Sequence, residues 1–189
     1  MVDFQHDIDS CLSTLKNGGV ILYPTDTVWG LGCDATNEEA VRKIYSIKQR
    51  ADEKALIILV ADEREVLQYV AAADLSLFDY LGQINNPTTV IYEGAIGLAD
   101  NLVGRDGSIA IRICRDEFCR HLIRRFRKPI VSTSANISGE IAAGTFKAVQ
   151  DEIKAQADYV VMYRQDDNTI ALPSSIIRWN NGDVEFIRK

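Results

Sequence analysis

Residues 108–134 read SIAIRICRDEFCRHLIRRFRKPIVSTS and contain a predicted strand, helix and strand in succession. In 108–113 apolar and polar positions alternate with a period of two, which predicts a strand with one polar face. In 116–126 the apolar residues recur at helical spacing, so we expect an amphipathic helix. Residues 129–134 form a second apolar run that ends in hydroxyl side chains, as a strand leading into a loop would. This order of elements indicates an α/β fold.

The rest of the chain mixes helices and strands without strict alternation. Further helices are expected at 4–17, from a capping box at Thr36 to about residue 50, at 63–82 and at 145–156. Further strands are expected at 20–23, 55–60, 88–92 and 159–163, and a hairpin joins 174–179 to 184–188 through the turn at 180–183. We therefore predict one α/β domain over residues 1–189, with a mixed sheet and flanking helices.

The composition is that of an ordinary globular protein, since 47% of the 189 residues are hydrophobic and 25% are charged. No run of about 18 apolar residues is present and the first residues are polar, so neither a membrane span nor a secretory signal is expected. The four cysteines are scattered with no C-x-x-C pair, which argues against a zinc site. We therefore expect a cytoplasmic protein with reduced thiols and no metal site of its own.

The charge is unevenly distributed along the chain. The net charge is −6, yet residues 104–128 hold eight basic side chains against three acidic ones. A basic segment in an acidic protein suggests a local anionic partner, such as a phosphate chain or tRNA. The same segment is also compatible with an amphipathic helix whose arginines face water. The sequence leaves both interpretations open.

Several common catalytic patterns are missing from the sequence. It has neither a G-x-x-x-x-G-K-[ST] phosphate loop nor a G-x-G-x-x-G fingerprint. It has only two histidines, His6 and His121, and no G-x-S-x-G elbow, which argues against a Ser-His-Asp hydrolase. Any chemistry must therefore come from other side chains.

Polar side chains gather where predicted elements end. They are Thr25, Asp26 and Thr27 after the first strand, Lys48 and Arg50 at a helix end, Arg112 in an apolar strand, and Ser134 and Asn136 after another strand. Ligands of open α/β sheets tend to bind at strand ends. Lys48 and Arg50 can meet one anion only if the helix ends between them, because residues two apart face different ways on a helix. Taken singly, these residues could equally be a charged helix end, a turn and a cap.

In this order and spacing, three segments resemble the YrdC/TsaC family of threonylcarbamoyl-AMP synthases. They are YPTDTVWGLGC at 23–33, KQR at 48–50 and STSANISG at 132–139. The hallmark pairs are K-x-R and S-x-N, and the resemblance extends from about residue 19 to residue 189, as in the short single-domain form. It implies an open, twisted α/β sheet curved around a large, positively charged cavity that holds the substrates.

The resemblance also implies a reaction, in which L-threonine, bicarbonate and ATP give threonylcarbamoyl-adenylate and pyrophosphate. Downstream tRNA-modification proteins then pass the threonylcarbamoyl group to the adenosine beside the tRNA anticodon. The threonine amine would form a carbamate, which then attacks the α-phosphorus of ATP. Mg²⁺ is expected to accompany the triphosphate, with phosphates and water supplying most of its ligands.

By matching position to position, the resemblance assigns roles to eleven residues. Lys48 and Arg50 would be the catalytic, phosphate-binding pair, and further ATP contacts would come from Lys54, Ser108, Ser134, Asn136 and Arg188. Threonine contacts would come from Thr27, Arg112, Ser132 and Ser174, with Arg112 on the substrate carboxylate. The plainer alternative places Arg112 on the polar, solvent-facing side of its strand, and Ser174 and Arg188 in an ordinary hairpin.

The chain also departs from the family pattern. Ala51 and Ala55 replace prolines, Leu59 stands where some members have a histidine, and INNPTT at 84–89 replaces W-P-G-P-x-T. We expect these changes near the cavity mouth. Two alternatives to the synthase remain, a double-stranded RNA or tRNA-binding module and a divergent paralogue that lacks this activity.

Overall fold

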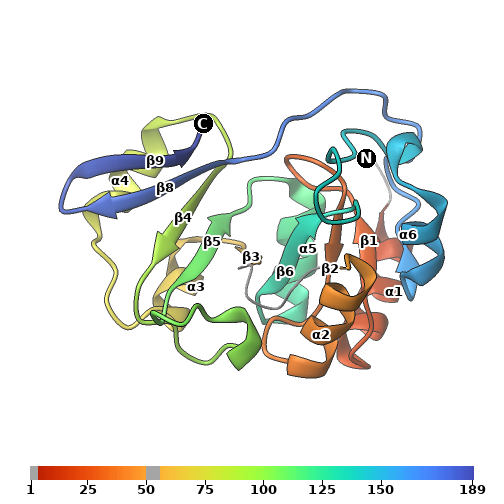
Figure 1. The fold of residues 1–189 in the computed structure, drawn as a ribbon, viewed down its shortest axis with the longest axis horizontal. Coiled ribbons are helices and arrows are strands. Elements are labelled where there is room, and N and C mark those ends of the chain that lie inside the picture. The colour runs from red at the N-terminus through yellow and green to blue at the C-terminus, as the bar shows by residue number, and fades with distance from the viewer. Residues whose placement is uncertain (1–3, 50–55) are drawn as a thin grey trace.

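The computed structural model describes residues 4–49 and 56–189. Its strands form one sheet in the order β7-β1-β2-β6-β3-β5-β4-β8-β9 (Figure 1). They are β1 (Ile21–Tyr23), β2 (Gly30–Gly32), β3 (Ile57–Val60), β4 (Thr88–Tyr92), β5 (Ile109–Ile113), β6 (Ile130–Ser134), β7 (Tyr159–Val160), β8 (Ser175–Asn180) and β9 (Asp183–Arg188). The sheet contains parallel pairs, such as β3 with β5, and antiparallel pairs, such as β3 with β6. The predicted α/β fold with a mixed sheet is confirmed.

Six α-helices and two short 3₁₀ turns flank the sheet in the described chain. The helices are α1 (Gln5–Lys16), α2 (Glu38–Ile47), α3 (Glu63–Tyr69), α4 (Ser76–Gln83), α5 (Glu117–Phe126) and α6 (Asp151–Gln156), and the turns are η1 (Asp100–Leu102) and η2 (Phe146–Ala148). No helix among the described residues is long and apolar enough to cross a membrane.

Several predicted boundaries were wrong. The helix expected at 63–82 is two helices, because Val70 leaves the helical conformation and pairs with Ala95 in an isolated bridge. The helix expected at 145–156 is likewise divided, into η2 and α6, by extended backbone at residues 149 and 150. The short strand β2 was not predicted, since its Gly-Leu-Gly sequence carries little strand signal.

The predicted capping box also differs in detail. Asn37, rather than Thr36, caps α2, and its Oδ1 accepts from the backbone N–H groups of Glu39 and Ala40. The Thr36 hydroxyl donates to Asp34 instead, at 2.7 Å. A side chain at either position can cap a helix start, so the choice depends on the tertiary contact with Asp34.

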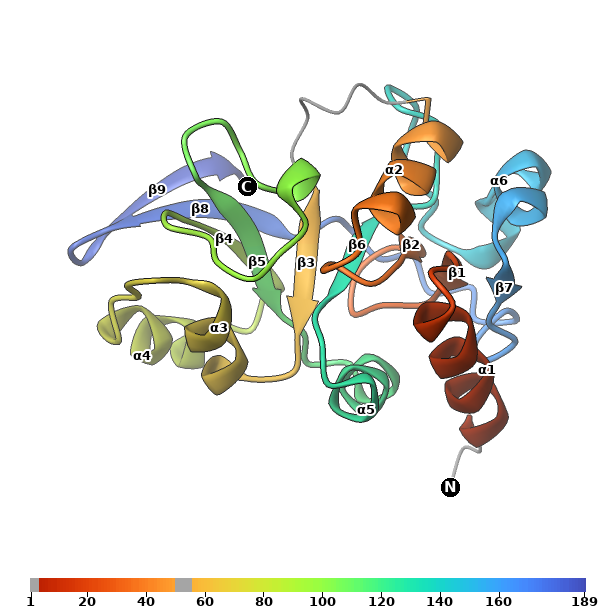
Figure 2. The ribbon, with the colours of Figure 1, turned by 90° about the horizontal axis from the view of Figure 1, so that it is seen from below.

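Alternation along the strands separates two faces of the sheet. Leu22 and Ile58 pack into the larger core beneath α2, whereas Leu59 and Ile130 pack against α1 and α5, which lie side by side (Figure 2). Ser132 lies two residues beyond Ile130 on the same strand face, and it borders a cavity. The face covered by α1 and α5 at one end is therefore open at the other, where ligands can enter.

Candidate functional site

The cavity on this open face has a volume of about 400 Å³. Strands β3, β5 and β6 contribute side chains to it, as do β8, β9 and the loop after β6. The segment that joins β7 to β8 crosses from one side of the sheet to the other and contributes Pro173 to the wall (Figure 1). The hollow is large enough for a small-molecule substrate.

The structure brings together seven of the side chains that the sequence singled out. Thr27, Arg112, Ser132, Ser134, Asn136, Ser174 and Arg188 all line the cavity, although they come from segments far apart in the chain. The described lining residues do not include Lys48 or Ser108. Arg50 and Lys54 lie outside the described residues.

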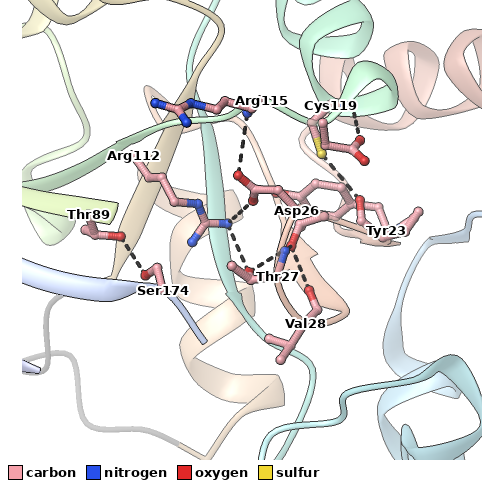
Figure 3. A network of polar contacts seen from close by, with 12 residues as sticks. Tyr23, Asp26, Thr27, Val28, Thr89, Arg112, Arg115, Cys119 and Ser174 are labelled. Atoms are coloured by element: carbon pink, nitrogen blue, oxygen red, sulfur yellow. Dashed lines mark hydrogen bonds and ion pairs between the residues drawn. The ribbon is translucent and has the colours of Figure 1, made fainter. Parts of the chain in front are cut away.

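Arg112 occupies the inner end of the cavity and does not point to solvent, because it is only 3% exposed. Its Nη2 pairs with Asp26 Oδ1 at 2.9 Å and donates to Thr27 Oγ1 at 3.2 Å (Figure 3). A buried guanidinium requires an anionic partner, and Asp26 supplies one. We did not predict this role for Asp26. The available signal was a carboxylate in a strand-end turn together with one arginine in an apolar strand.

Lys48 is buried beneath the loop that follows β6. Its Nζ donates to the backbone carbonyls of Ser134 and of Asn136, the latter at 2.8 Å. The carbonyl of Lys48 itself accepts from Ser138 N–H at 2.9 Å. Helix α2 ends at Ile47, and Gln49 has a left-handed φ of 49°, so the chain leaves the helical path directly after Lys48. In this structure Lys48 fixes the backbone of the S-x-N loop.

Asn136 presents a polar atom without a described partner. Its Nδ2 donates to the carbonyls of Ile137 and Glu140, at 2.9 Å and 2.8 Å. Its Oδ1 is buried and makes no hydrogen bond within the described residues. An unsatisfied buried acceptor is costly, and this oxygen has no surface open to the cavity.

Ser174 and Arg188 form another part of the cavity wall. Arg188 Nε and Nη2 donate to the Ser174 carbonyl at 3.0 Å and 2.7 Å, and the Ser174 and Thr89 hydroxyls are 2.8 Å apart. Burial lowers the pKa of Arg188, and the nearby charge of Arg112 lowers it further. The Arg188 guanidinium gives this wall a charged donor that can contact an anionic group. Thr89, which supports Ser174, was not predicted.

Ser108 lies in the turn before β5, away from the cavity lining. Its hydroxyl donates to Asp106 at 2.6 Å and its backbone N–H donates to the same carboxylate oxygen. This geometry is that of an Asx turn.

The departures from the family pattern are not gathered at the cavity mouth as expected. Leu59 is fully buried in the core under α1 and α5. Asn86 borders a separate hollow of about 100 Å³, together with Asp26 and Arg115. Ala51 and Ala55 lie outside the described residues.

The basic segment 104–128 is dispersed over several contacts. Arg115 donates to the last carbonyls of α4, at Leu81 and Ile84. Arg125 pairs with Asp9 at 2.8 Å, and Lys128 pairs with Asp34 at 2.6 Å. These partners neutralise much of the segment, so they favour the interpretation of a solvated helix over a continuous anion-binding face.

The other titratable groups of the described chain offer little reactive chemistry. Burial raises the pKa of the Cys11, Cys33 and Cys119 thiols, which are therefore protonated at neutral pH. No group of three or more His, Cys, Asp or Glu side chains that could hold a metal ion is found in the described parts, 4–49 and 56–189. What the cavity offers is positioned hydrogen-bonding groups, among them the guanidinium groups of Arg112 and Arg188.

Comparison with known proteins gives a consistent result. The Sua5/YciO/YrdC family model, whose description reads Telomere recombination, matches residues 13–189. The threonylcarbamoyl-AMP synthase of Idiomarina loihiensis is 38% identical over 177 residues, covering 91% of this chain and 92% of that protein. The threonylcarbamoyl-AMP synthase of Pseudoalteromonas translucida is 34% identical over 183 residues, covering 95% of this chain and 97% of that protein.

Solved structures share the fold. P. abyssi Sua5 complexed with L-threonine superposes with a TM-score of 0.86 at 21% identity, covering 100% of this chain and 55% of that one, so this chain spans a little more than half of that protein. E. coli YciO superposes with a TM-score of 0.80 at 20% identity, covering 98% of this chain and 89% of that one. The family match over most of the sequence, the relatives above 30% identity and the common fold lead to one conclusion: this chain belongs to the Sua5/YciO/YrdC family.

Proposed function

We propose that this protein is a threonylcarbamoyl-AMP synthase, a nucleotidyltransferase that forms threonylcarbamoyl-adenylate and pyrophosphate from L-threonine, bicarbonate and ATP. The observation that carries the proposal is the convergence of seven expected substrate contacts on one cavity of about 400 Å³. The two curated relatives carry this activity in their names, and the Sua5 structure was solved with L-threonine.

The polar groups that line the cavity suggest separate contacts for the two substrates. At the inner end, Arg112 is held by Asp26 and Thr27 and would bind the threonine carboxylate through a second edge of its guanidinium. The Asn136 side chain and the Arg188 guanidinium, which also line the cavity, would contact the nucleotide. Lys48 positions the S-x-N backbone there, and Arg50 and Lys54 are proposed as phosphate ligands.

The described residues support catalysis by positioning and charge stabilisation. The threonine amine attacks carbon dioxide or bicarbonate to give a carbamate, and a carbamate oxygen attacks the α-phosphorus of ATP while pyrophosphate leaves. Cationic side chains would stabilise the charge that develops on pyrophosphate. The described side chains contain no ready Mg²⁺ site, so Mg²⁺ is proposed only as a companion of the triphosphate, and no step is derived through it.

The product is an activated acyl-adenylate, so the proposal includes downstream tRNA-modification proteins that consume it and a cytoplasmic location. Direct binding of tRNA or double-stranded RNA is a separate property. The pairing of Arg125 and Lys128 with acidic side chains gives it no particular support.

The decisive experiment is mass detection of threonylcarbamoyl-adenylate after the full chain is incubated with ATP, L-threonine and bicarbonate. Pyrophosphate release should require all three substrates. An absence of adenylate, or pyrophosphate release that ignores threonine and bicarbonate, would reject the synthase. RNA binding that falls steeply with salt and occurs without adenylate formation would favour the RNA-binding alternative.

A matched pair of variants links the activity to the cavity. Arg188→Ala should raise the KM for ATP about tenfold or more, because it removes a charged donor from the proposed nucleotide contacts. Arg178→Ala lies on the neighbouring strand β8 and borders a different hollow, so it should leave the KM for ATP unchanged. If both variants changed the KM for ATP equally, the proposed contact between Arg188 and the nucleotide would be contradicted.

A further inference from the structure

The turn after β1 holds a closed set of hydrogen bonds behind the cavity. The Thr25 hydroxyl is 2% exposed and lies 2.8 Å from the Val28 carbonyl, to which it donates. The same oxygen accepts from Thr27 N–H at 3.0 Å and lies 3.0 Å from the Thr27 hydroxyl. Thr27 lines the cavity and lies beside Arg112 (Figure 3), whereas Thr25 does not line the cavity.

The number of protons decides the direction of the bond between the two hydroxyl groups. A threonine hydroxyl has one proton to donate and two lone pairs to accept with. Thr25 uses its proton on Val28, so Thr27 must donate the proton that lies between the two oxygens. The two lone pairs of Thr25 are then both occupied, by the N–H and by the O–H of Thr27.

The Thr27 hydroxyl can therefore only accept further hydrogen bonds, through its lone pairs. Its only hydroxyl proton points at Thr25, and one lone pair accepts from Arg112 Nη2 at 3.2 Å. Thr27 lines the cavity, and its remaining lone pair can take a hydrogen bond only from a donor. A carboxylate oxygen has no proton, so a substrate carboxylate would be repelled by Thr27 and attracted by Arg112 beside it.

We propose that Thr25 is a positioning residue that locks the Thr27 hydroxyl as an acceptor for the α-amino N–H of the amino-acid substrate. This inference rests on the proposed function. An amino acid whose carboxylate pairs with Arg112 carries its amine one carbon away, next to the Thr27 oxygen that the same guanidinium touches. Holding one N–H of the neutral amine on Thr27 leaves the nitrogen lone pair free to attack the carbon of carbon dioxide. One C=O π bond then opens onto oxygen to give the carbamate, and a proton passes from nitrogen to solvent; with bicarbonate, a water molecule leaves instead.

The test is calorimetric binding of L-threonine and of L-2-aminobutyrate, which has the amine but lacks the hydroxyl. Thr25→Val should weaken both ligands by the same factor, about three- to tenfold, because the freed Thr27 proton can rotate into the cavity. Thr25→Ser, which keeps the hydroxyl, should bind both within about twofold of the wild-type affinity. Thr36→Val is the matched control, since it removes a threonine hydroxyl bonded to Asp34 outside the cavity.

Three results would overturn the inference. The first is unchanged affinity of Thr25→Val for both ligands. The second is a loss of affinity for L-threonine alone, which would assign Thr27 to the substrate hydroxyl. The third is failure of Thr25→Ser to restore the wild-type affinity. Thr27→Val gives a second route if Thr25→Val does not fold, and it should show the same equal loss for both ligands. In turnover, Thr25→Val should raise the KM for L-threonine and leave the KM for ATP unchanged. A wild-type protein that binds no L-threonine would instead reject the proposed function itself.

Discussion

Replacing Asp26 with alanine tests whether the ion pair with Arg112 holds the cavity together. The change removes the carboxylate 2.9 Å from Arg112 Nη2, and the two side chains are only 4% and 11% exposed. Removing one partner of a buried pair costs about 3–5 kcal/mol, because the other charge stays buried without compensation. Thr27 still accepts from Arg112 and the cavity admits water, so we expect the lower end, about 3 kcal/mol.

Thermal denaturation provides the measurement. For a chain of this size 1 kcal/mol shifts Tm by about 2–4 °C, so Asp26→Ala should lower Tm by about 6–12 °C. Asp26→Asn keeps an oxygen acceptor, so it should lower Tm by roughly half as much as Asp26→Ala does. Acetate, which can fill the space of the missing carboxylate, should raise the Tm of Asp26→Ala more than that of the wild type, compared with chloride at equal ionic strength. A Tm within 2 °C of wild type for Asp26→Ala would refute the view that this pair stabilises the fold.

Three further predictions follow from particular residues. Lys48→Met should weaken ATP binding tenfold or more in calorimetry, because the loop after β6 loses the ammonium that holds two of its carbonyls, and unchanged affinity would contradict this. Gln49→Gly should raise the free energy of unfolding by up to about 1 kcal/mol in denaturant titration, since φ is 49°, and a clear loss would show that this side chain makes a stabilising contact. Burial and a hydrogen bond to Asp7 raise the pKa of Tyr159 to about 12, so its contribution to stability is complete below the unfolded tyrosine pKa of about 10 and is lost as the pH rises to about 12. Tyr159→Phe should flatten that alkaline decline, and an unchanged slope would contradict it.

Local signals in the sequence were enough for most elements. Period-two alternation placed β5 and helical spacing placed α5, because these patterns express one buried face of a single element. Long-range contacts decided where a predicted helix is interrupted. Val70 ends a helix because it pairs with Ala95, a partner that no local pattern identifies.

In the candidate site, too, some features were predicted from the sequence and others are visible only in the structure. The order and spacing of the strand-end motifs were enough to predict the family and seven of the residues that line the cavity. The sequence did not predict that Asp26 pairs with Arg112, that Thr89 supports Ser174, or that Lys48 turns toward backbone carbonyls.

The sequence by itself determined which residue types stand at the strand ends and which strand faces are apolar. Only the tertiary structure decided which of those polar groups meet, and therefore which partner each proton and charge has. Arg112 and Thr27 lie 85 positions apart in the chain and 3.2 Å apart in space. Hydrogen bonds and ion pairs act over a few ångströms of space, so their partners are set by how the sheet brings distant strands together.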